Sequence, residues 1–348
     1  MKLRRKLSSL CGLPSFLLLL LIFAPASANA CGMPINARIA SEQALIVFDG
    51  QTSAITTSIG IEPSAPDAAV IFPVPAAPEV DQPVGGEALF GYLAQVTKPL
   101  VQVERELLWG FDPGFDGMVG GTAPTGGVDL LGRETLGGYD VARLAADDPQ
   151  ALSGWLAENG FSLPQGAEPI LAAYVEEGWS FVAVRLAPNA PGGSLAPLRM
   201  RFPATEIVYP MRLGKLSDRP VSVDLYLVTG YRTTIDGLNT GYAGPIAALD
   251  EPPAAELAAI LAGGSYLTKL SSDSIAPEQI TADAVARQAA NDEPYRTVTT
   301  RYEQVWIFSE YSWEIVGLVA FLLLSFSIIV VALFFRKRMG EISQPKPE

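Results

Sequence analysis

The feature that most constrains this 348-residue chain is an uninterrupted apolar run near its carboxyl end. Residues Ile315 to Phe335 contain no Lys, Arg, Asp or Glu over 21 positions. As a helix this run would be about 32 Å long, which matches a hydrocarbon core of about 30 Å. Arg336-Lys337-Arg338 follow at once, and such basic flanks lie on the cytoplasmic side of a membrane. We therefore predict a single transmembrane helix over 315–335 and a basic cytoplasmic tail over 336–348.

The amino end carries the three parts of a secretory signal. A basic stretch precedes Phe16 to Ala24, an apolar run of nine residues that is too short to span a bilayer. Ala28-Asn29-Ala30 then presents small residues to a signal peptidase. We expect cleavage of the signal peptide, residues 1–30, and a mature start at Cys31.

Signal and anchor together place the middle of the chain outside the cytoplasm. We expect an extracytoplasmic domain over 31–300 and a juxtamembrane stalk over 301–312, held at the plasma membrane as a single-pass type I protein. Cys11 leaves with the signal, so Cys31 is the one cysteine of the mature chain and no intrachain disulfide can form. Whether Cys31 is free, lipidated or cross-linked between chains stays open.

Charge and composition exclude several functional classes. Residues 31–312 contain 16 basic and 34 acidic residues, a formal charge of −18, which repels phosphate backbones and argues against nucleic-acid binding. The chain has no histidine, which removes Ser-His-Asp and Cys-His catalysis and histidine-ligated metals. It also lacks a Walker loop, a dinucleotide-binding glycine motif and a nucleophile elbow, so no cofactor is expected.

The patterning of the outer segment predicts an α+β fold with an antiparallel-rich sheet and several short helices. Asp49-Gly50 is a hairpin turn, and Asp148 with Pro149 opens a helix that Asn159-Gly160 ends. Apolar residues alternate along 220–229, which predicts a strand with one wet face. Helices are expected at 86–96, 149–158, 168–177, 252–261 and 277–290, the last two making a helical part over 251–290. Strands are expected at 44–48, 52–61, 68–74, 101–108, 179–186, 198–202, 207–213, 220–229 and 265–270.

A glycine-rich segment, about 110–138, interrupts this pattern and is expected to form a long loop. It contains Asp112, Asp116 and Asp129, whose carboxylates could bind Ca²⁺. The Asp-x-Asp-x-Asp-Gly ladder of calcium loops is missing, so the sequence favours solvated turn residues and no metal site.

One pair of acidic residues suggests hydrolysis. Glu104 and Glu106 share a face of a predicted strand, and paired carboxylates hydrolyse glycosides when a substrate fits between them. Trp109, Trp155 and Trp179 could supply a sugar-stacking platform. Glutamates on a wet strand face and tryptophans of the core or rim are the more common structures.

A modest basic group stands out in this acidic chain. Arg199 and Arg201 share a strand face, and Arg212 follows nearby. They could contact an anionic ligand or pair with acids of the chain itself, and the second interpretation is favoured. Catalytic residues therefore stay unknown, with Trp155, Trp179, Arg199 and Arg201 as binding candidates.

Several segments, taken in their order along the chain, resemble one bacterial family. They are Cys31-Gly32, Phe72-Pro73-Val74-Pro75, Leu152 to Gly160, Tyr174 to Ala183, Pro197-Leu198-Arg199, Tyr209 to Leu213 and Tyr266-Leu267-Thr268. Together they are similar to the family of domain of unknown function 2330, over most of residues 31–300. The resemblance implies an exported bacterial protein, often membrane-tethered, and supplies no catalytic residues.

These observations favour a non-enzymatic, membrane-anchored module that binds an envelope protein or polysaccharide. One alternative is a carboxylate-type hydrolase acting on an envelope polysaccharide, which requires Glu104 and Glu106 to converge in a cleft beside tryptophans. Another is a Ca²⁺-dependent adhesion or sensor module. The ligand and the oligomeric state stay open at this point.

Overall fold

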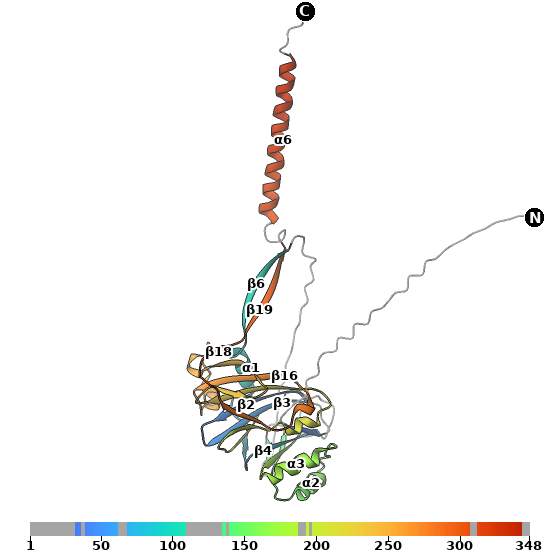
Figure 1. Ribbon diagram of the computed structural model, residues 1–348, viewed down its shortest axis with the longest axis vertical. Helices are drawn as coiled ribbons and strands as arrows, with labels where there is room; N and C mark the ends of the chain where they lie inside the picture. Colours follow the sequence, from blue (N-terminus) through green and yellow to red (C-terminus); the bar gives the residue numbers. More distant parts are fainter. Residues whose placement is uncertain are drawn as a thin grey trace, which may run out of the picture.

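The computed structural model describes residues 32–35, 39–61, 68–108, 134–136, 139–186, 193–194, 197–306 and 312–342. Their strands form two large sheets and two small ones, and helices pack on the outer faces of the large sheets. Figure 1 shows a body from which a narrow two-stranded ribbon leads to a long C-terminal helix. The predicted α+β class with antiparallel-rich sheets is confirmed.

The first large sheet has five strands, all antiparallel to their neighbours. In spatial order they are β1 (Met33–Ile35), β4 (Ala69–Val74), β9 (Ser180–Leu186), β8 (Tyr139–Ala145) and β7 (Glu134–Leu136). Every side chain of β4 is buried, in keeping with its apolar run without alternation. Both faces of the sheet are therefore covered at β4.

The second large sheet has nine strands and is antiparallel except where β2 pairs with β13. In order they are β18 (Tyr295–Arg296), β15 (Asn239–Pro245), β16 (Tyr266–Ile275), β13 (Val221–Thr229), β2 (Ile39–Phe48), β3 (Thr52–Ile61), β11 (Leu198–Pro203) and β5 (Glu79–Asp81), with β10 (Gly193–Ser194) beside β3. The predicted hairpin joins β2 to β3: the Asp49 carboxylate accepts the N–H groups of Gln51 and Thr52 at 2.9 and 2.7 Å, and Gly50 has a φ of 97°. These two donors hold the pKa of Asp49 below its usual range.

Four α-helices among the described residues complete the layers of the body. Helices α2 (Pro149–Glu158) and α3 (Ala167–Glu176) cover the five-stranded sheet, and α1 (Gly86–Val96) and α4 (Ala255–Ile260) cover the nine-stranded sheet. Along β13, Leu225 and Leu227 face the core between the sheets, whereas Tyr226 and Val228 face α1 and α4. The wet face predicted for this strand is thus dry in its second half, because two helices cover it.

The prediction of an amphipathic helix over 277–290 is wrong. A single 3-10 turn, η3 (Pro277–Gln279), precedes β17 (Ala284–Gln288). This strand lies between β12 (Ile207–Tyr209) and β14 (Thr233–Ile235) in a three-stranded sheet. Ala284 and Ala286 are buried on one side of it, a period of two that the ladder imposes although alanine has a high helix propensity.

Other boundaries also differ from the sequence prediction. The strand expected over 207–213 ends at Tyr209, where Pro210 and the 3-10 helix η1 (Arg212–Leu216) follow. Strand β16 continues to Ile275, and α4 is a single short helix, so 251–290 is not a helical part. A further 3-10 turn, η2 (Ile246–Ala248), follows β15.

A two-stranded parallel ribbon stands outside the body and leads towards the C-terminal helix (Figure 1). It consists of β6 (Leu100–Leu108) and β19 (Val298–Trp306), so part of the predicted stalk is a strand. Arg296 fixes its base, because its guanidinium donates to the carbonyl oxygens of Val96 and Lys98 at 3.2 and 2.8 Å and pairs with Asp250 at 2.8 Å.

Helix α6 (Ser312–Ile342) follows the ribbon. Over Gly317–Arg336 its mean hydropathy is 3.0, and none of this segment is buried against the rest of the protein. Among the described helices it is the one long and apolar enough to cross a membrane, as the sequence predicts. The predicted signal peptide, residues 1–30, lies outside the described residues.

Candidate binding site

The carboxyl end of α2 positions an aromatic pair. Gly160 has a φ of 77°, and the N–H of Phe161 donates to the carbonyl of Leu156 at 2.8 Å. This is a Schellman end, which folds the residue after the glycine back onto the helix. The Phe161 ring consequently lies 6.0 Å from that of Trp155, with an angle of 26° between the ring planes.

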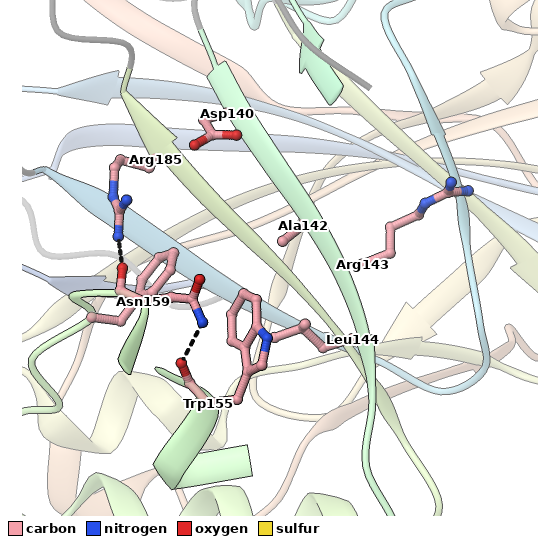
Figure 2. A pocket seen from close by; sticks show the side chains of 8 residues that line it. Asp140, Ala142, Arg143, Leu144, Trp155, Asn159 and Arg185 are labelled. Atoms are coloured by element: carbon pink, nitrogen blue, oxygen red, sulfur yellow. Dashed lines mark hydrogen bonds between the residues drawn. The ribbon is translucent and has the colours of Figure 1, made fainter. Parts of the chain in front are cut away.

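A pocket of about 300 Å³ lies where this helix end meets β8 and β9 (Figure 2). Such a volume is at the lower end of the range for ligand sites, about 300–1,000 Å³. The residues that matter most for its chemistry are Asp140, Leu144, Trp155, Asn159, Phe161 and Arg185.

Alternation along β8 directs side chains into this pocket. Tyr139 and Val141 face the core between the two sheets, so Asp140 and Leu144 face α2. Asp140 is directly opposite Arg185 in the β8–β9 ladder, which puts an acidic and a basic side chain on one face. Figure 2 shows this pair at one end of the pocket and Trp155 with Leu144 at the other.

The Arg185 guanidinium is held from two sides. Its carbon lies 4.5 Å from the centre of the Phe161 ring, within the range of a cation–π contact, and Nη2 donates to the carbonyl oxygen of Asn159. The Asn159 side-chain amide donates in turn to the carbonyl of Trp155 at 2.9 Å. Because these groups are already ordered, a ligand would immobilise few side chains.

The pocket combines an aromatic surface with a carboxylate, an amide and a guanidinium. Aromatic rings pack against the apolar face of a sugar ring, while carboxylate, amide and guanidinium groups can bond its hydroxyls. The lining carries no nucleophile next to a base, and among the described residues no three His, Cys, Asp or Glu gather to hold a metal. The arrangement suits binding of a small polar ligand.

Trp155 and Trp179 line different pockets. Trp179 follows the Schellman end of α3, where its N–H donates to the carbonyl of Tyr174 at 2.9 Å and the two rings are 4.7 Å apart. It borders a cavity of about 450 Å³ that Glu206 and Pro203 also line. The two tryptophans therefore do not share one stacking platform.

The arginine candidates contact acids of the chain. Arg199 Nε donates to Asp81 at 2.8 Å, and this hydrogen bond raises the pKa of Arg199. Arg201 lies 3.7 Å from a carboxylate oxygen of Glu79. Arg212 pairs with Glu177, the residue after α3, and with Asp283, the residue before β17, and it lines a third cavity of about 450 Å³ with Lys215.

Glu104 lies on the ribbon and is exposed, and it lines none of the three pockets. The side chain of Glu106 is outside the described part of the structure, as are Trp109, Asp112, Asp116 and Asp129. None of these three pockets therefore places Glu104 beside a tryptophan.

Sequence reasoning did not find Asp140, Phe161 or Arg185 as pocket residues. A signal for Phe161 was present, because Asn159-Gly160 predicts a helix end and a Schellman end turns the following residue towards the helix. No short sequence pattern indicates that Asp140 lies opposite Arg185, because this pair depends on two strands whose paired residues are 45 positions apart in the sequence.

The fold defines a class before any comparison: a sheet-rich α+β body with a C-terminal helix that could anchor it in a membrane. The family model described as an uncharacterized protein conserved in bacteria, DUF2330, matches residues 25–287, and the chain belongs to this family. The resemblance found in the sequence is thereby confirmed.

No curated protein matches the chain. The crystal structure of baculovirus P35 is similar at 11% sequence identity, covering 76% of this chain and 97% of that chain, with a TM-score of 0.31. Similarity at this level carries no argument about fold or function.

Proposed function

We propose that this protein is a membrane-tethered module that binds a saccharide of the cell envelope and does not cleave it. The observation that carries the proposal is the pocket between α2 and the β8–β9 ladder, in which Trp155 and Phe161 lie beside Asp140, Asn159 and Arg185. Aromatic and hydrogen-bonding groups in this combination suit a ring with one apolar face and several hydroxyls.

The tether supports an envelope location. Helix α6 is long enough to cross a bilayer, and the ribbon before it has nine residues in each strand. At about 3.3 Å per residue the ribbon is about 30 Å long. With the amino end outside the cytoplasm, it would hold the body away from the lipid surface, within reach of envelope polymers.

The alternative of a carboxylate-type hydrolase has less support. It requires two acids on either side of a scissile bond, separated by about 5–10 Å. Asp140 is the one carboxylate in the pocket, and it stands opposite Arg185 rather than another acid. Glu104 lies on the exposed ribbon.

The proposal is tested by calorimetric titration of the full-length protein in nanodiscs with chitotetraose, a soluble oligomer of an envelope amino sugar. Trp155→Ala removes the stacking surface and should raise the dissociation constant about tenfold, which is equivalent to a loss of about 1.4 kcal/mol of binding free energy. Arg185→Ala should raise the dissociation constant by a similar factor. Arg201→Ala, which changes an arginine outside the pocket, should leave the dissociation constant unchanged.

Two results would contradict the proposal. One is equal affinity of the native, Trp155→Ala and Arg185→Ala proteins, which would place binding elsewhere. The other is a rise in reducing ends during the titration, which would indicate cleavage. Thermal unfolding of each variant, measured beside the titration, separates lost binding from lost folding.

A further inference from the structure

Among the described residues, the ribbon of β6 and β19 is unusual because it is parallel, has two strands and has no further element packed on it. Parallel sheets are found buried on both faces, and a two-stranded sheet on its own is marginally stable. Here apolar side chains are more than half exposed: Val101 at 60%, Val103 at 52%, Val298 at 55% and Tyr302 at 67%. A structure of this kind needs a further partner along its faces or edges.

Each ribbon strand has one edge without a strand beside it in the described structure. The nine residues of β6 pair with the nine of β19 in one continuous register, from Leu100 opposite Val298 to Leu108 opposite Trp306. The outer edges therefore present backbone N–H and C=O groups over the ribbon's length, which is the usual template for adding a strand.

The anchor determines the direction of any strand that a second copy would add. Both ribbon strands run from the body towards α6 (Figure 1). Copies anchored in one bilayer all point the same way, so a neighbour's ribbon strand lies parallel to both strands of the first copy. This is the pairing that β6 and β19 already make.

The charges of the ribbon distinguish between the possible edges. Arg105 of β6 is directly opposite Glu303 of β19, and their side chains approach to 3.6 Å. If β19 of one copy pairs with β6 of the next in this same register, Glu303 has an arginine on each side. The resulting row alternates in sign across the whole assembly.

Pairing of like edges gives the opposite result. Two adjacent β6 strands would bring Arg105 beside the same arginine of the neighbouring copy. Two adjacent β19 strands would bring Glu303 beside the neighbour's equivalent glutamate and Arg301 beside its equivalent arginine. Like charges directly opposite each other in a sheet are destabilising. The charge pattern therefore favours β6 against β19.

We propose that copies of this chain associate head to tail through the ribbon, β19 of one copy adding to β6 of the next as a parallel strand. Head-to-tail contacts close into rings when the rotation permits it. Copies in one membrane are related by rotation about the membrane normal, which makes a closed ring of ribbons the natural product. The assembly rests on the membrane anchoring of the proposed function and is independent of the saccharide site.

Cysteine cross-linking of the full-length protein in membranes tests this interface, in a background with Cys31→Ser. Gln102 and Thr300 are exposed and stand opposite each other in the ladder. A copy with Gln102→Cys and one tag is co-expressed with a copy that carries Thr300→Cys and a second tag. A short bis-maleimide should join the two tags several-fold more often than it joins either variant to itself.

Glu168→Cys in both tagged copies is the control, because this residue is exposed on α3, which Figure 1 shows at the end of the body away from the ribbon. Mixed-tag product no greater than in this control would overturn the proposal. A predominance of Gln102→Cys or Thr300→Cys self-linked product would also overturn it, since it would indicate pairing of like edges.

A charge exchange tests the register. Arg105→Glu combined with Glu303→Arg keeps the alternating row within its own assemblies but places like charges at every junction with a native copy. Introduced into both cysteine copies, the exchange should leave cross-linking intact. Introduced into one copy, it should reduce the mixed product several-fold, and equal cross-linking in the two cases would contradict the head-to-tail charge row. The saccharide titration is unaffected by either result, so the two proposals fail separately.

Discussion

Arg212 and Asp283 form an ion pair, with 2.8 Å between Nε and Oδ2, that joins η1 to the loop before β17. The Asp283 carboxylate also accepts the hydroxyl of Tyr174 at 2.6 Å and the backbone N–H groups of Met211 and Arg212 at 2.8 and 3.1 Å. The Arg212 guanidinium also donates from Nη1 to Oε1 of Glu177 at 2.6 Å, and its carbon lies 3.8 Å from the centre of the Tyr174 ring. Helix α3, η1 and the β17 sheet therefore meet at one carboxylate.

Asp283→Ala should be strongly destabilising. The side chain of Asp283 is 9% exposed, and its removal leaves the Tyr174 hydroxyl without its acceptor and the partly buried Arg212 guanidinium with Glu177 as its remaining carboxylate. Breaking a buried pair in this way costs about 3–5 kcal/mol. Denaturant unfolding measures the loss.

The matched control is Asp236→Ala. Asp236 pairs with Arg287 at 2.7 Å, but the two side chains are 86% and 65% exposed. A surface pair of this kind contributes about 0–1 kcal/mol. Equal losses for Asp283→Ala and Asp236→Ala would show that the Asp283 network does not stabilise the fold.

Two buried tyrosines should respond differently to substitution by phenylalanine. The Tyr139 hydroxyl has no hydrogen-bond partner among the described residues, so Tyr139→Phe should change the unfolding free energy at neutral pH by less than about 1 kcal/mol. Tyr174→Phe removes a bond to Asp283 and should cost about 1.5–3 kcal/mol. Denaturant unfolding of the two variants at neutral pH checks this difference.

The same tyrosines predict a loss of stability in alkali. Burial raises the pKa of Tyr139, and burial together with the nearby Asp283 carboxylate raises that of Tyr174. Both stay protonated in the folded state while the unfolded chain ionises, so their contribution is complete below about pH 10 and declines above it. Unfolding titrations across this range should show a smaller decline for Tyr139→Phe than for the native protein, and identical declines would contradict the prediction.

Two glycines should respond in opposite ways to alanine. Gly91 is exposed within α1 and a Cβ there would meet nothing within 4 Å, so Gly91→Ala should stabilise by about 0.5–1 kcal/mol. At Gly264 a Cβ would lie 2.5 Å from the backbone of Thr229, so Gly264→Ala should destabilise by about 1–3 kcal/mol. Thermal unfolding compares the two, and a stabilised Gly264→Ala variant would refute the close approach of these chain segments.

Elements with strong local signals could be predicted from the sequence. The Asp49-Gly50 hairpin and the start of α2 are examples: Asp148 accepts the N–H groups of Gln150 and Ala151 at 3.3 and 2.9 Å, as its position before Pro149 implies. Such signals act within three or four residues, and they do not depend on the rest of the fold.

Elements that depend on distant partners could not be predicted in this way. Residues 277–290 carry alanines suited to a helix, yet β12 and β14 take up 284–288 as a strand. The ribbon pairs residues nearly 200 positions apart, and a parallel pair has no turn to indicate it. In the binding pocket, Trp155 could be selected as a large aromatic residue near a helix end, but Arg185 could not.

Membrane orientation gives a further prediction. With Cys31→Ser as background, Glu158→Cys on the body should react with an impermeant maleimide in intact cells. Ser343→Cys, beyond the basic cluster, should react only after permeabilisation. Labelling of Ser343→Cys in intact cells, with Glu158→Cys unlabelled, would indicate the opposite orientation.

Binding of a saccharide in the pocket beside Trp155, without cleavage, can be measured directly. Saturation-transfer NMR of the full-length protein in nanodiscs with chitotetraose measures both properties in one sample. We expect transfer to the sugar ring protons, its loss in Trp155→Ala, and an unchanged ligand spectrum over the experiment. Equal transfer with the Trp155→Ala protein, or the appearance of new reducing-end signals, would contradict it.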